Sequence, residues 1–289
     1  MKKVYEVAGH RFAVLMPDGD RAWGEMQKYE PFLAHESEPY AFAVEMIEEM
    51  PDTSDKRFVL SDNQASDMPR NTLYEWAGNW LVESAPSAAA PVLLHIVMDK
   101  DFKTARFHVL GAMDYSVNAV IMLMFALTSA RSGMLLMHAS VILHAGKGYL
   151  FLGKSGTGKS THSQLWMKNI AGCELLNDDN PVLKVEGDGT IHVYGSPWSG
   201  KTPCYRNSHA PVGAIVDLHQ AAENEIRRLS LFESYAAVYV SFSGFRFVKE
   251  IADALHDTNE KIVRSVPCYS LHCLPNAEAA WLCHNTVAN

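Results

Sequence analysis

The sequence has no run of basic residues, and this absence excludes a class of partner. Its 25 lysine and arginine residues are outnumbered by 33 aspartate and glutamate residues, for a formal net charge of −8 at pH 7. A protein that binds nucleic acid needs clustered basic side chains to neutralise phosphates. We therefore expect no nucleic-acid partner.

Long apolar runs are also scarce. Charged residues and Pro17 interrupt the segment after the basic first three residues, before the apolar core of a signal peptide can form. The longest apolar segment, Val117–Ala130, contains polar residues and falls short of a membrane span. We expect a cytoplasmic protein that binds no membrane, and the sequence leaves a homo-oligomer open.

Cysteine is sparse. The five cysteines are odd in number, scattered and mostly in apolar surroundings, which is typical of reduced thiols. Some of them lie near histidines in the sequence, so a zinc site has to be considered: Cys268, His272, Cys273, Cys283 and His284. None of their spacings matches a zinc-finger pair, and we expect no zinc.

The first part of the chain shows short alternating segments, which are typical of strands. The range Val4–Met16 predicts a hairpin around Gly9-His10. Leu73–Val82 is ambiguous between strand and helix. Other strand candidates are Phe42–Ile47, Arg57–Leu60, Val92–Met98 and Ala105–Leu110. We predict a smaller, mainly-β domain over residues 1–112, with no catalytic signature of its own.

A different pattern follows in residues 113–289, where helices and strands are mixed. Asp114–Arg131 predicts an apolar helix that ends before Gly133. Glu186–Gly189 predicts the turn of a hairpin between Pro181–Val185 and Thr190–Tyr194. Later candidates are a strand over Val212–Leu218, helices over Leu229–Tyr239 and Phe245–Val263, a strand over Pro267–Cys273 and a helix over Asn276–Cys283. These features predict an α/β domain.

One motif in this domain carries specific chemistry. Residues 153–160 read Gly153-Lys154-Ser155-Gly156-Thr157-Gly158-Lys159-Ser160, the phosphate-binding P-loop pattern. An apolar strand candidate precedes the motif, and Thr161–Asn169 predicts a helix after it. The loop amides and the helix N-terminus would bind ATP phosphates, with Thr161 in the first helical turn. Lys159 would reach the β- and γ-phosphates, and the Ser160 hydroxyl would bind Mg²⁺.

Two adjacent carboxylates follow an apolar run after the loop. Asp178 and Asp179 end the segment Leu175-Leu176-Asn177-Asp178-Asp179. Phosphoryl transfer needs a carboxylate near the metal and another group to orient or deprotonate the attacking hydroxyl. The alternative is a polar turn before Pro181.

Three further polar residues are candidates. His138 lies in an apolar strand just before the loop strand, where it would assist proton transfer or bind the γ-phosphate; the alternative is a core histidine. Lys201 and Arg206 lie in a polar loop and would neutralise charge on the transferred phosphoryl group; the alternative is a solvated loop charge. His162 and Arg228 are weaker candidates.

Together these residues resemble a known family. The order of His138, the P-loop and Asp178-Asp179 resembles the catalytic core of HPr kinase/phosphorylase, whose fold is shared with phosphoenolpyruvate carboxykinase. The resemblance covers roughly residues 134–287 and is nearest the small HPr-kinase-like serine kinases, whose segments are similar to Gly195–Gly200 and Val266–Ala280. It implies a mixed-sheet α/β P-loop kinase core.

The resemblance also implies roles. His138 matches the family's histidine beside the phosphates, Asp178 its base, and Asp179 the acidic group near the metal. One part of the pattern is missing. The bifunctional enzymes have a Glu-x-Arg-Gly stretch after the hairpin, and here that region reads His192-Val193-Tyr194-Gly195. HPr as a substrate and the reverse phosphorylase reaction are therefore not implied.

The sequence predicts an ATP-dependent kinase that phosphorylates a hydroxyl, with serine of a protein, peptide or free amino acid as the expected acceptor. Two alternatives stay open. One is a catalytically inactive ATP-binding sensor or scaffold, which the missing glutamate favours. The other is a phosphoenolpyruvate carboxykinase-like enzyme, although no arginine-lined oxaloacetate site is evident.

Overall fold

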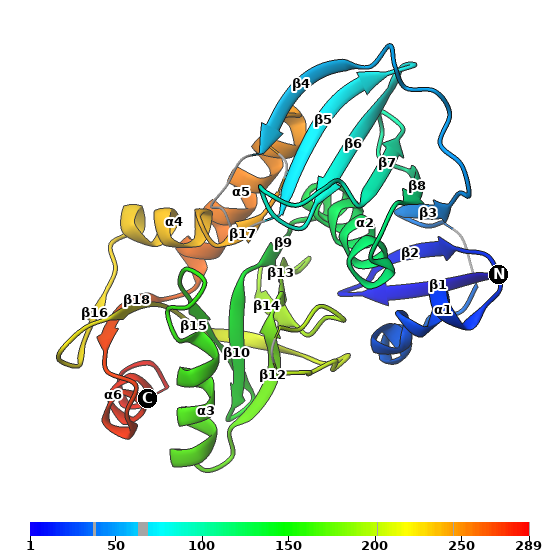
Figure 1. Cartoon of the computed structure of the whole chain (residues 1–289). Helices are drawn as coiled ribbons and strands as arrows, with labels where there is room; N and C mark the ends of the chain where they lie inside the picture. Colours follow the sequence, from blue (N-terminus) through cyan, green and yellow to red (C-terminus); the bar gives the residue numbers. More distant parts are fainter. Residues whose placement is uncertain (37–38, 63–68, 201, 245, 289) are drawn as a thin grey trace. The chain divides into compact units, whose positions relative to one another are not determined.

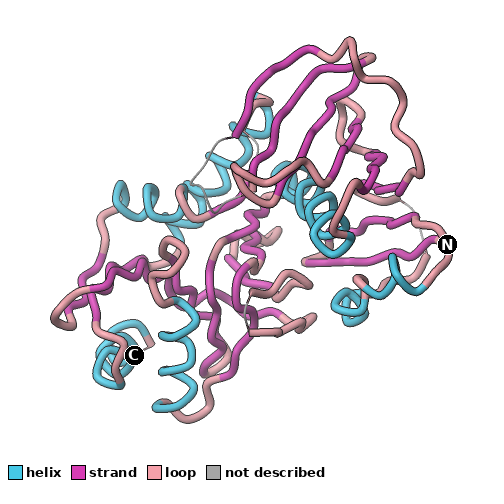
Figure 2. Tube along the Cα trace, viewed as in Figure 1, coloured by secondary structure: helices cyan, strands magenta, loops and turns pink. Residues whose placement is uncertain are grey.

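The computed structural model describes residues 1–36, 39–62, 69–200, 202–244 and 246–288. The chain forms two compact units, Met1–Thr128 and Ser129–Asn289. Each contains a mixed β-sheet with helices, so the protein belongs to the mixed α/β class (Figures 1 and 2). Helix α2 (Met113–Ser129) groups almost entirely with the first unit. The sequence analysis assigned it to the second domain.

The first unit is built on one sheet. Its described residues give eight strands in the order β1-β2-β3-β8-β7-β6-β5-β4. Strand β3 runs parallel to both β2 and β8, and the other neighbours are antiparallel. The strands are β1 (Lys2–Val7), β2 (His10–Leu15), β3 (Phe42–Met46), β4 (Arg57–Asp62), β5 (Arg70–Trp76), β6 (Asn79–Ala85), β7 (Leu94–Met98) and β8 (Thr104–Val109). The short helices α1 (Asp20–Gly24) and η1 (Gln27–Phe32) follow β2 and were not expected from the sequence.

The ambiguous segment Leu73–Val82 is a hairpin. Strands β5 and β6 pair through a turn at Ala77-Gly78, where φ is 47° and 76°. Two-residue hairpins favour turns with two positive φ angles, because these match the right-handed twist of the strands. The predicted hairpin at the start of the chain is confirmed, with Ala8-Gly9 at its turn.

Helix α2 packs on the first unit's sheet and continues into the short helix η2 (Ala130–Ser132). Its Tyr115 hydroxyl lies 2.7 Å from Ser84 Oγ, and Thr128 Oγ1 lies 2.8 Å from His10 Nε2. Among the described residues, the stretch 113–132 is the one helical segment long and apolar enough to cross a membrane by length and composition, and 56% of its apolar window is buried within the structure. This helical segment is longer than the apolar run Val117–Ala130, which by itself is too short to span a membrane. Its burial is what a core helix shows.

The second unit is built on a larger sheet. Its described strands follow the order β12-β10-β11-β15-β14-β13-β9-β17, and β18 pairs with both β15 and β16. Strands β11, β15 and β18 are parallel neighbours, which places their carboxyl ends at one edge. The strands are β9 (Met134–Met137), β10 (Ala139–His144), β11 (Lys147–Leu152), β12 (Glu174–Asp179), β13 (Val182–Val185), β14 (Ile191–Tyr194), β15 (His209–Gln220), β16 (Glu225–Arg228), β17 (Phe242–Ser243) and β18 (Cys268–Cys273).

Besides η2, four α-helices belong to the second unit in the part of the chain that the structure describes: α3 (Lys159–Asn169), α4 (Leu231–Tyr239), α5 (Lys249–Ser265) and α6 (Ala277–Val287). Helix α4 begins with a capping box between Ser230 and Glu233. Trp166 of α3 is fully buried against Tyr149 and Phe151 of β11. The hairpin predicted around Glu186–Gly189 is confirmed by β13 and β14. The predicted helix start at Phe245 lies outside the described residues.

Candidate active site

The P-loop motif lies between a strand and a helix. Strand β11 ends at Leu152, helix α3 begins at Lys159, and residues 153–158 form the loop between them. Gly153 has a φ of 138°, and a Cβ added there would lie 3.2 Å from Leu218 O and from the Thr157 side chain. Only glycine fits so close an approach in that conformation. The strand–loop–helix context expected from the sequence is therefore present.

The neighbouring strand β15 holds the loop in place. It runs parallel to β11, with Asp217 paired with Leu152, the last strand residue before the loop. At the end of β15, Gln220 Nε2 donates to Gly156 O at 3.2 Å and to Thr157 O at 3.4 Å. Thr157 in turn donates through its amide and its hydroxyl to Lys154 O, at 3.1 and 2.7 Å. These bonds fix the loop backbone around Lys154–Gly156, whose side chains or Cα atoms are exposed.

Lys159 is folded back into the loop. Its side chain is 9% exposed, and Nζ donates to Gly153 O at 2.9 Å and to Lys154 O at 3.4 Å. Burial lowers the pKa of the Lys159 ammonium, while the carboxylates of Asp179 and Asp178 partly oppose that shift. A phosphate group arriving at the loop would supply the anion that this buried ammonium needs.

His138 links Lys159 to a carboxylate. Lys159 Nζ lies 2.9 Å from His138 Nε2, and His138 Nδ1 lies 3.1 Å from Asp179 Oδ1. A lysine ammonium can only donate, so Nε2 accepts and the ring proton sits on Nδ1, where it is donated to Asp179. The three side chains form a chain of donors and acceptors. The core-histidine alternative does not describe this arrangement.

Asp178 is buried beside the hydrogen-bonded side chains of Lys159, His138 and Asp179. Strands β10 and β12 pair antiparallel with Ser140 opposite Asp178, and directly opposed residues share a face of the sheet. Ser140 Oγ lies 2.6 Å from Ser163 Oγ of α3, so Asp178 is on the α3 side. Its side chain is 4% exposed, and Oδ2 has no hydrogen-bond partner among the described residues. A buried carboxylate oxygen without a partner is costly and is a feature of functional sites.

The end of strand β12, which carries the two aspartates, is held by residues that were not candidates from the sequence. Asn177 Nδ2 donates to Ser196 Oγ at 3.1 Å and to Trp198 O at 3.3 Å, and Asn177 Oδ1 accepts from the Asp179 amide at 3.1 Å. The Gly200 amide donates to Asp178 O at 2.7 Å, and a Cβ on Gly200 would lie 2.8 Å from that oxygen. An asparagine directly before the two carboxylates was the signal available in the sequence.

The structure does not bring every predicted site residue to this place. Arg206 donates to Leu175 O and to Glu174 Oε2, both at 2.8 Å, at the start of β12 and away from Asp178 and Asp179 at its end. Ser160 and Thr161 lie in the first turn of α3. Lys201 lies outside the described residues. His162 is a core residue, buried against Phe151 and accepting from Trp166 Nε1 at 3.1 Å.

The site offers oxygen ligands for a metal. Among the described residues, no group of three or more His, Cys, Asp and Glu side chains could hold an ion by itself. A Mg²⁺ ion bound with a nucleotide needs only one or two protein oxygens, because phosphates and waters complete its shell. The Ser160 hydroxyl and the Asp179 carboxylate are hard oxygen donors of this kind. The expectation that the protein holds no zinc stays a prediction.

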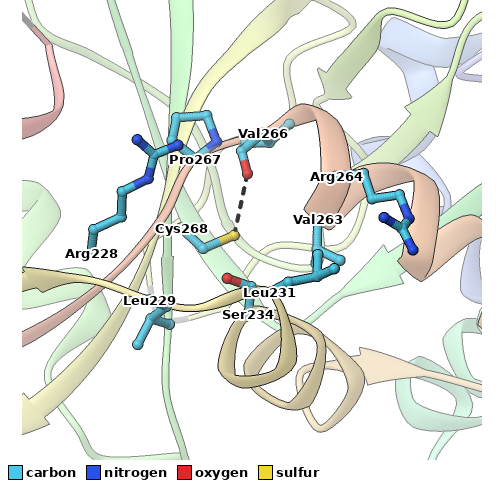
Figure 3. Close-up of a pocket in the computed structure, with 9 residues that line it drawn as sticks. All are labelled: Arg228, Leu229, Leu231, Ser234, Val263, Arg264, Val266, Pro267 and Cys268. Carbon is cyan, nitrogen blue, oxygen red and sulfur yellow. Dashed lines mark hydrogen bonds between the residues drawn. The ribbon is translucent and has the colours of Figure 1, made fainter.

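A cavity of about 310 Å³ lies elsewhere in the second unit, beside α4. Figure 3 shows Cys268 in its middle, with Arg228 on one side and Arg264 on the other. Arg228, a weaker candidate, is among the nine lining residues, but Lys159, His138, Asp178 and Asp179 are not, so this cavity is not the candidate active site.

Comparison with known proteins adds little. No family model matches the chain, and no curated protein matches it. Among solved structures, the chain is similar to the HPr(Ser) kinase/phosphatase from Coxiella burnetii, with 14% sequence identity over 53% of this chain and 93% of that chain, and a TM-score of 0.31. A TM-score this low carries no argument about function.

Proposed function

We propose that the protein is an ATP-dependent kinase that transfers the γ-phosphoryl group to a hydroxyl, with serine as the expected acceptor, in a protein, a peptide or the free amino acid. One observation carries the proposal. The Asp178 carboxylate oxygen that has no hydrogen-bond partner in the described part of the chain is buried on the α3 side of the sheet, where α3 begins with the P-loop lysine, Lys159. A P-loop supplies phosphate binding, and an adjacent buried carboxylate supplies the base that a kinase needs in addition.

The P-loop would bind the nucleotide phosphates. Its backbone amides and the N-terminus of α3 supply positive potential, and Lys159 would exchange its bonds to Gly153 O and Lys154 O for the β- and γ-phosphates. This exchange satisfies a buried ammonium whose pKa burial has lowered.

Ser160 and Asp179 would hold Mg²⁺, which when bound neutralises charge on the β- and γ-phosphates. His138 orients Asp179 through Nδ1 and contacts Lys159 through Nε2, so it positions the metal-binding carboxylate relative to the phosphate-binding lysine. In-line transfer requires a fixed distance between the metal-binding carboxylate and the phosphate-binding lysine.

Asp178 would act on the acceptor. A carboxylate that accepts the hydroxyl proton must be ionised, within reach and without a competing donor. Oδ2 has no hydrogen-bond donor among the described residues, and the bonds that the Gly200 amide and the Asn177 side chain make with the backbone of Asp178 and Asp179 hold that backbone rigid. Catalysis in such a site is mainly positioning and charge neutralisation.

The experiment that tests the proposal is an incubation with γ-labelled ATP and Mg²⁺ against free serine, HPr and peptides from a native lysate. Transfer of label to a hydroxyl supports the kinase. ATP binding without transfer or hydrolysis supports the sensor or scaffold alternative. Release of carbon dioxide that depends on oxaloacetate supports the carboxykinase-like alternative.

A further inference from the structure

A second cavity, of about 480 Å³, lies next to the P-loop and is not used by the residues described so far. One wall is the sheet, through Asp217 and His219 of β15 and Ser270 and His272 of β18. The facing wall is helix α4, through Ala236, Ala237 and Val240. The volume lies within the range of small-molecule sites.

The position of this cavity follows from the strand register. Asp217 is the partner of Leu152, which directly precedes the P-loop, and paired strands lie about 4.8 Å apart. Three residues later on the same strand, Gln220 bonds the loop carbonyls. In open α/β sheets, ligands bind outside the carboxyl ends of parallel strands, and β11, β15 and β18 are such strands. Phe151 packs on α3 and pairs with Val216, so Asp217 and His219 lie on the other face of the sheet. The cavity therefore begins beside the strand residue that precedes the loop, on the face of the sheet opposite α3.

The sheet wall presents an aromatic surface. The rings of His219 and His272 are stacked, with centroids 4.7 Å apart and an interplanar angle of 21°. Across the cavity, the alanines and Val240 of α4 are small or apolar and leave the space open. A flat unsaturated ring can stack on an outer face of this pair and bury an edge against the apolar wall, and so gain both stacking and burial.

The charges that line the cavity do not suit an anion. Arg227 is the one lysine or arginine among the lining residues, and its guanidinium is paired with Glu233 at 2.8 Å. The Asp217 carboxylate lies 2.9 Å from His219 Nε2 and keeps further lone pairs for another donor. The cavity thus offers hydrogen-bond acceptors beside an aromatic face and no uncompensated cation, which disfavours a phosphate or a carboxylate group.

We infer that this cavity binds the nucleoside end of the nucleotide whose phosphates lie in the P-loop. The purine ring stacks on the His219–His272 pair, and the Asp217 carboxylate accepts a hydrogen bond from a ring amino group or a ribose hydroxyl. This inference rests on the proposed nucleotide binding and deepens it, because it assigns the residues that recognise the nucleoside.

The test is calorimetric titration of the full chain with Mg²⁺-ATP and with Mg²⁺-tripolyphosphate, which carries the phosphates without the nucleoside. We expect His219→Ala to weaken ATP binding about tenfold and to leave tripolyphosphate binding within twofold. His219→Phe restores a flat aromatic face and should recover most of the affinity for ATP. His192→Ala, an unrelated partly exposed histidine on β14, is the control and should change neither. Lys159→Ala should weaken both ligands.

The outcomes separate this inference from the proposal beneath it. Unchanged ATP affinity in both His219→Ala and His272→Ala overturns the nucleoside assignment, and so does an equal loss for ATP and tripolyphosphate in folded variants. If ATP affinity is unchanged in these variants but phosphoryl transfer requires a higher acceptor concentration, the cavity binds the acceptor instead. If neither ligand binds the wild-type protein, the proposed phosphate site itself is wrong, and the inference falls with it.

Discussion

The two compact units differ in how deeply they bury charged side chains. In the first unit, Glu83 pairs with Lys56, and Glu75 pairs with Arg57 and Lys100, all on partly exposed parts of the sheet. In the second unit, the side chains of Lys159 and Asp178 are only 9% and 4% exposed. Ion pairs near a surface change stability little, whereas a buried ionisable group has a large desolvation cost. The second unit therefore keeps an arrangement that stability alone does not favour.

The difference indicates where function lies. A buried carboxylate oxygen that has no hydrogen-bond partner among the described residues, as in Asp178, persists only if its removal is more harmful than its cost. In the described part of the first unit, no buried carboxylate oxygen lacks a hydrogen-bond partner. The predictions below test whether this contrast is real, beginning with the largest expected effect.

Replacing Asp178 by asparagine should separate stability from activity. We expect Asp178→Asn to reduce phosphoryl transfer by roughly 10²-fold or more, the scale of a lost general base, while ATP affinity changes only a few-fold. The same substitution should raise the melting temperature, because a neutral amide costs less to bury than a carboxylate. A transfer assay and thermal unfolding of the same preparation measure both effects.

Two matched variants sharpen this result. Asp188→Asn changes a carboxylate in an exposed hairpin turn and should leave transfer unchanged. Asp179→Asn should raise the Mg²⁺ concentration needed for half-maximal activity, because Asp179 is the proposed metal ligand. Wild-type transfer by Asp178→Asn would rule out the base assignment, and a lowered melting temperature would contradict the view that this carboxylate is destabilising.

The buried imidazole of His162 should make the second unit sensitive to acid. Burial lowers the pKa of His162 to about 4, from its ordinary value of 6.5. Acid therefore protonates the unfolded chain first, and stability from this group is lost as pH falls from about 6.5 towards 4. The full loss is about 3 kcal/mol, at 1.36 kcal/mol for each pKa unit.

The variant that checks this is His162→Gln, whose amide oxygen can still accept from Trp166 Nε1 but does not titrate. Urea unfolding at pH 7 and pH 4.5 should show a smaller loss of stability in His162→Gln than in the wild type. His256→Gln, at an exposed position on α5, should lose as much as the wild type does. Identical pH dependence in all three proteins would show that His162 is not the group responsible.

Lys159→Ala should weaken Mg²⁺-ATP binding at least tenfold, a loss of about 1.4 kcal/mol or more. The reason is that the variant removes the cation of the P-loop and leaves its backbone in place. Calorimetry measures the affinity, and Lys168→Ala, an exposed lysine in the last turn of the same helix, is the control. Equal affinity for ATP in wild type and Lys159→Ala would end the nucleotide proposal.

Part of the site could be predicted because its functional residues are consecutive in the sequence. The loop from Gly153 to Ser160 and the pair Asp178-Asp179 each stand together in the sequence, and the flanking apolar run marked the strand before the loop. His138 was a candidate only by its place before the loop strand. Its contacts with Lys159 and Asp179 depend on strand order, which local sequence does not determine.

Other parts were beyond sequence reasoning. Arg206 looked like a loop cation near the phosphates, but the structure pairs it with Glu174 at the far end of β12. His219 looks like a lone polar residue in a strand, and His272 was considered only for a zinc site. The parallel pairing of β15 and β18 brings the two rings together. The hairpin within Leu73–Val82 was missed because its turn, Ala77-Gly78, contains an alanine where asparagine or aspartate is the usual signal.

The Ala77-Gly78 turn leads to the prediction with the smallest expected effect, which should be the same in both units. Ala77 has a φ of 47° in the first unit, and Ala145 has a φ of 48° in the β10–β11 hairpin of the second, and both are exposed. A left-handed conformation is unfavourable for alanine and tolerated by asparagine. We expect Ala77→Asn and Ala145→Asn each to increase the free energy of unfolding by about 0.5–1 kcal/mol, measured in urea, with phosphoryl transfer unchanged. Both units should respond alike, because backbone strain at an exposed turn does not depend on the site that the unit carries. A higher free energy of unfolding for one variant and a lower one for the other would mean that the units differ in more than the burial of their charged side chains.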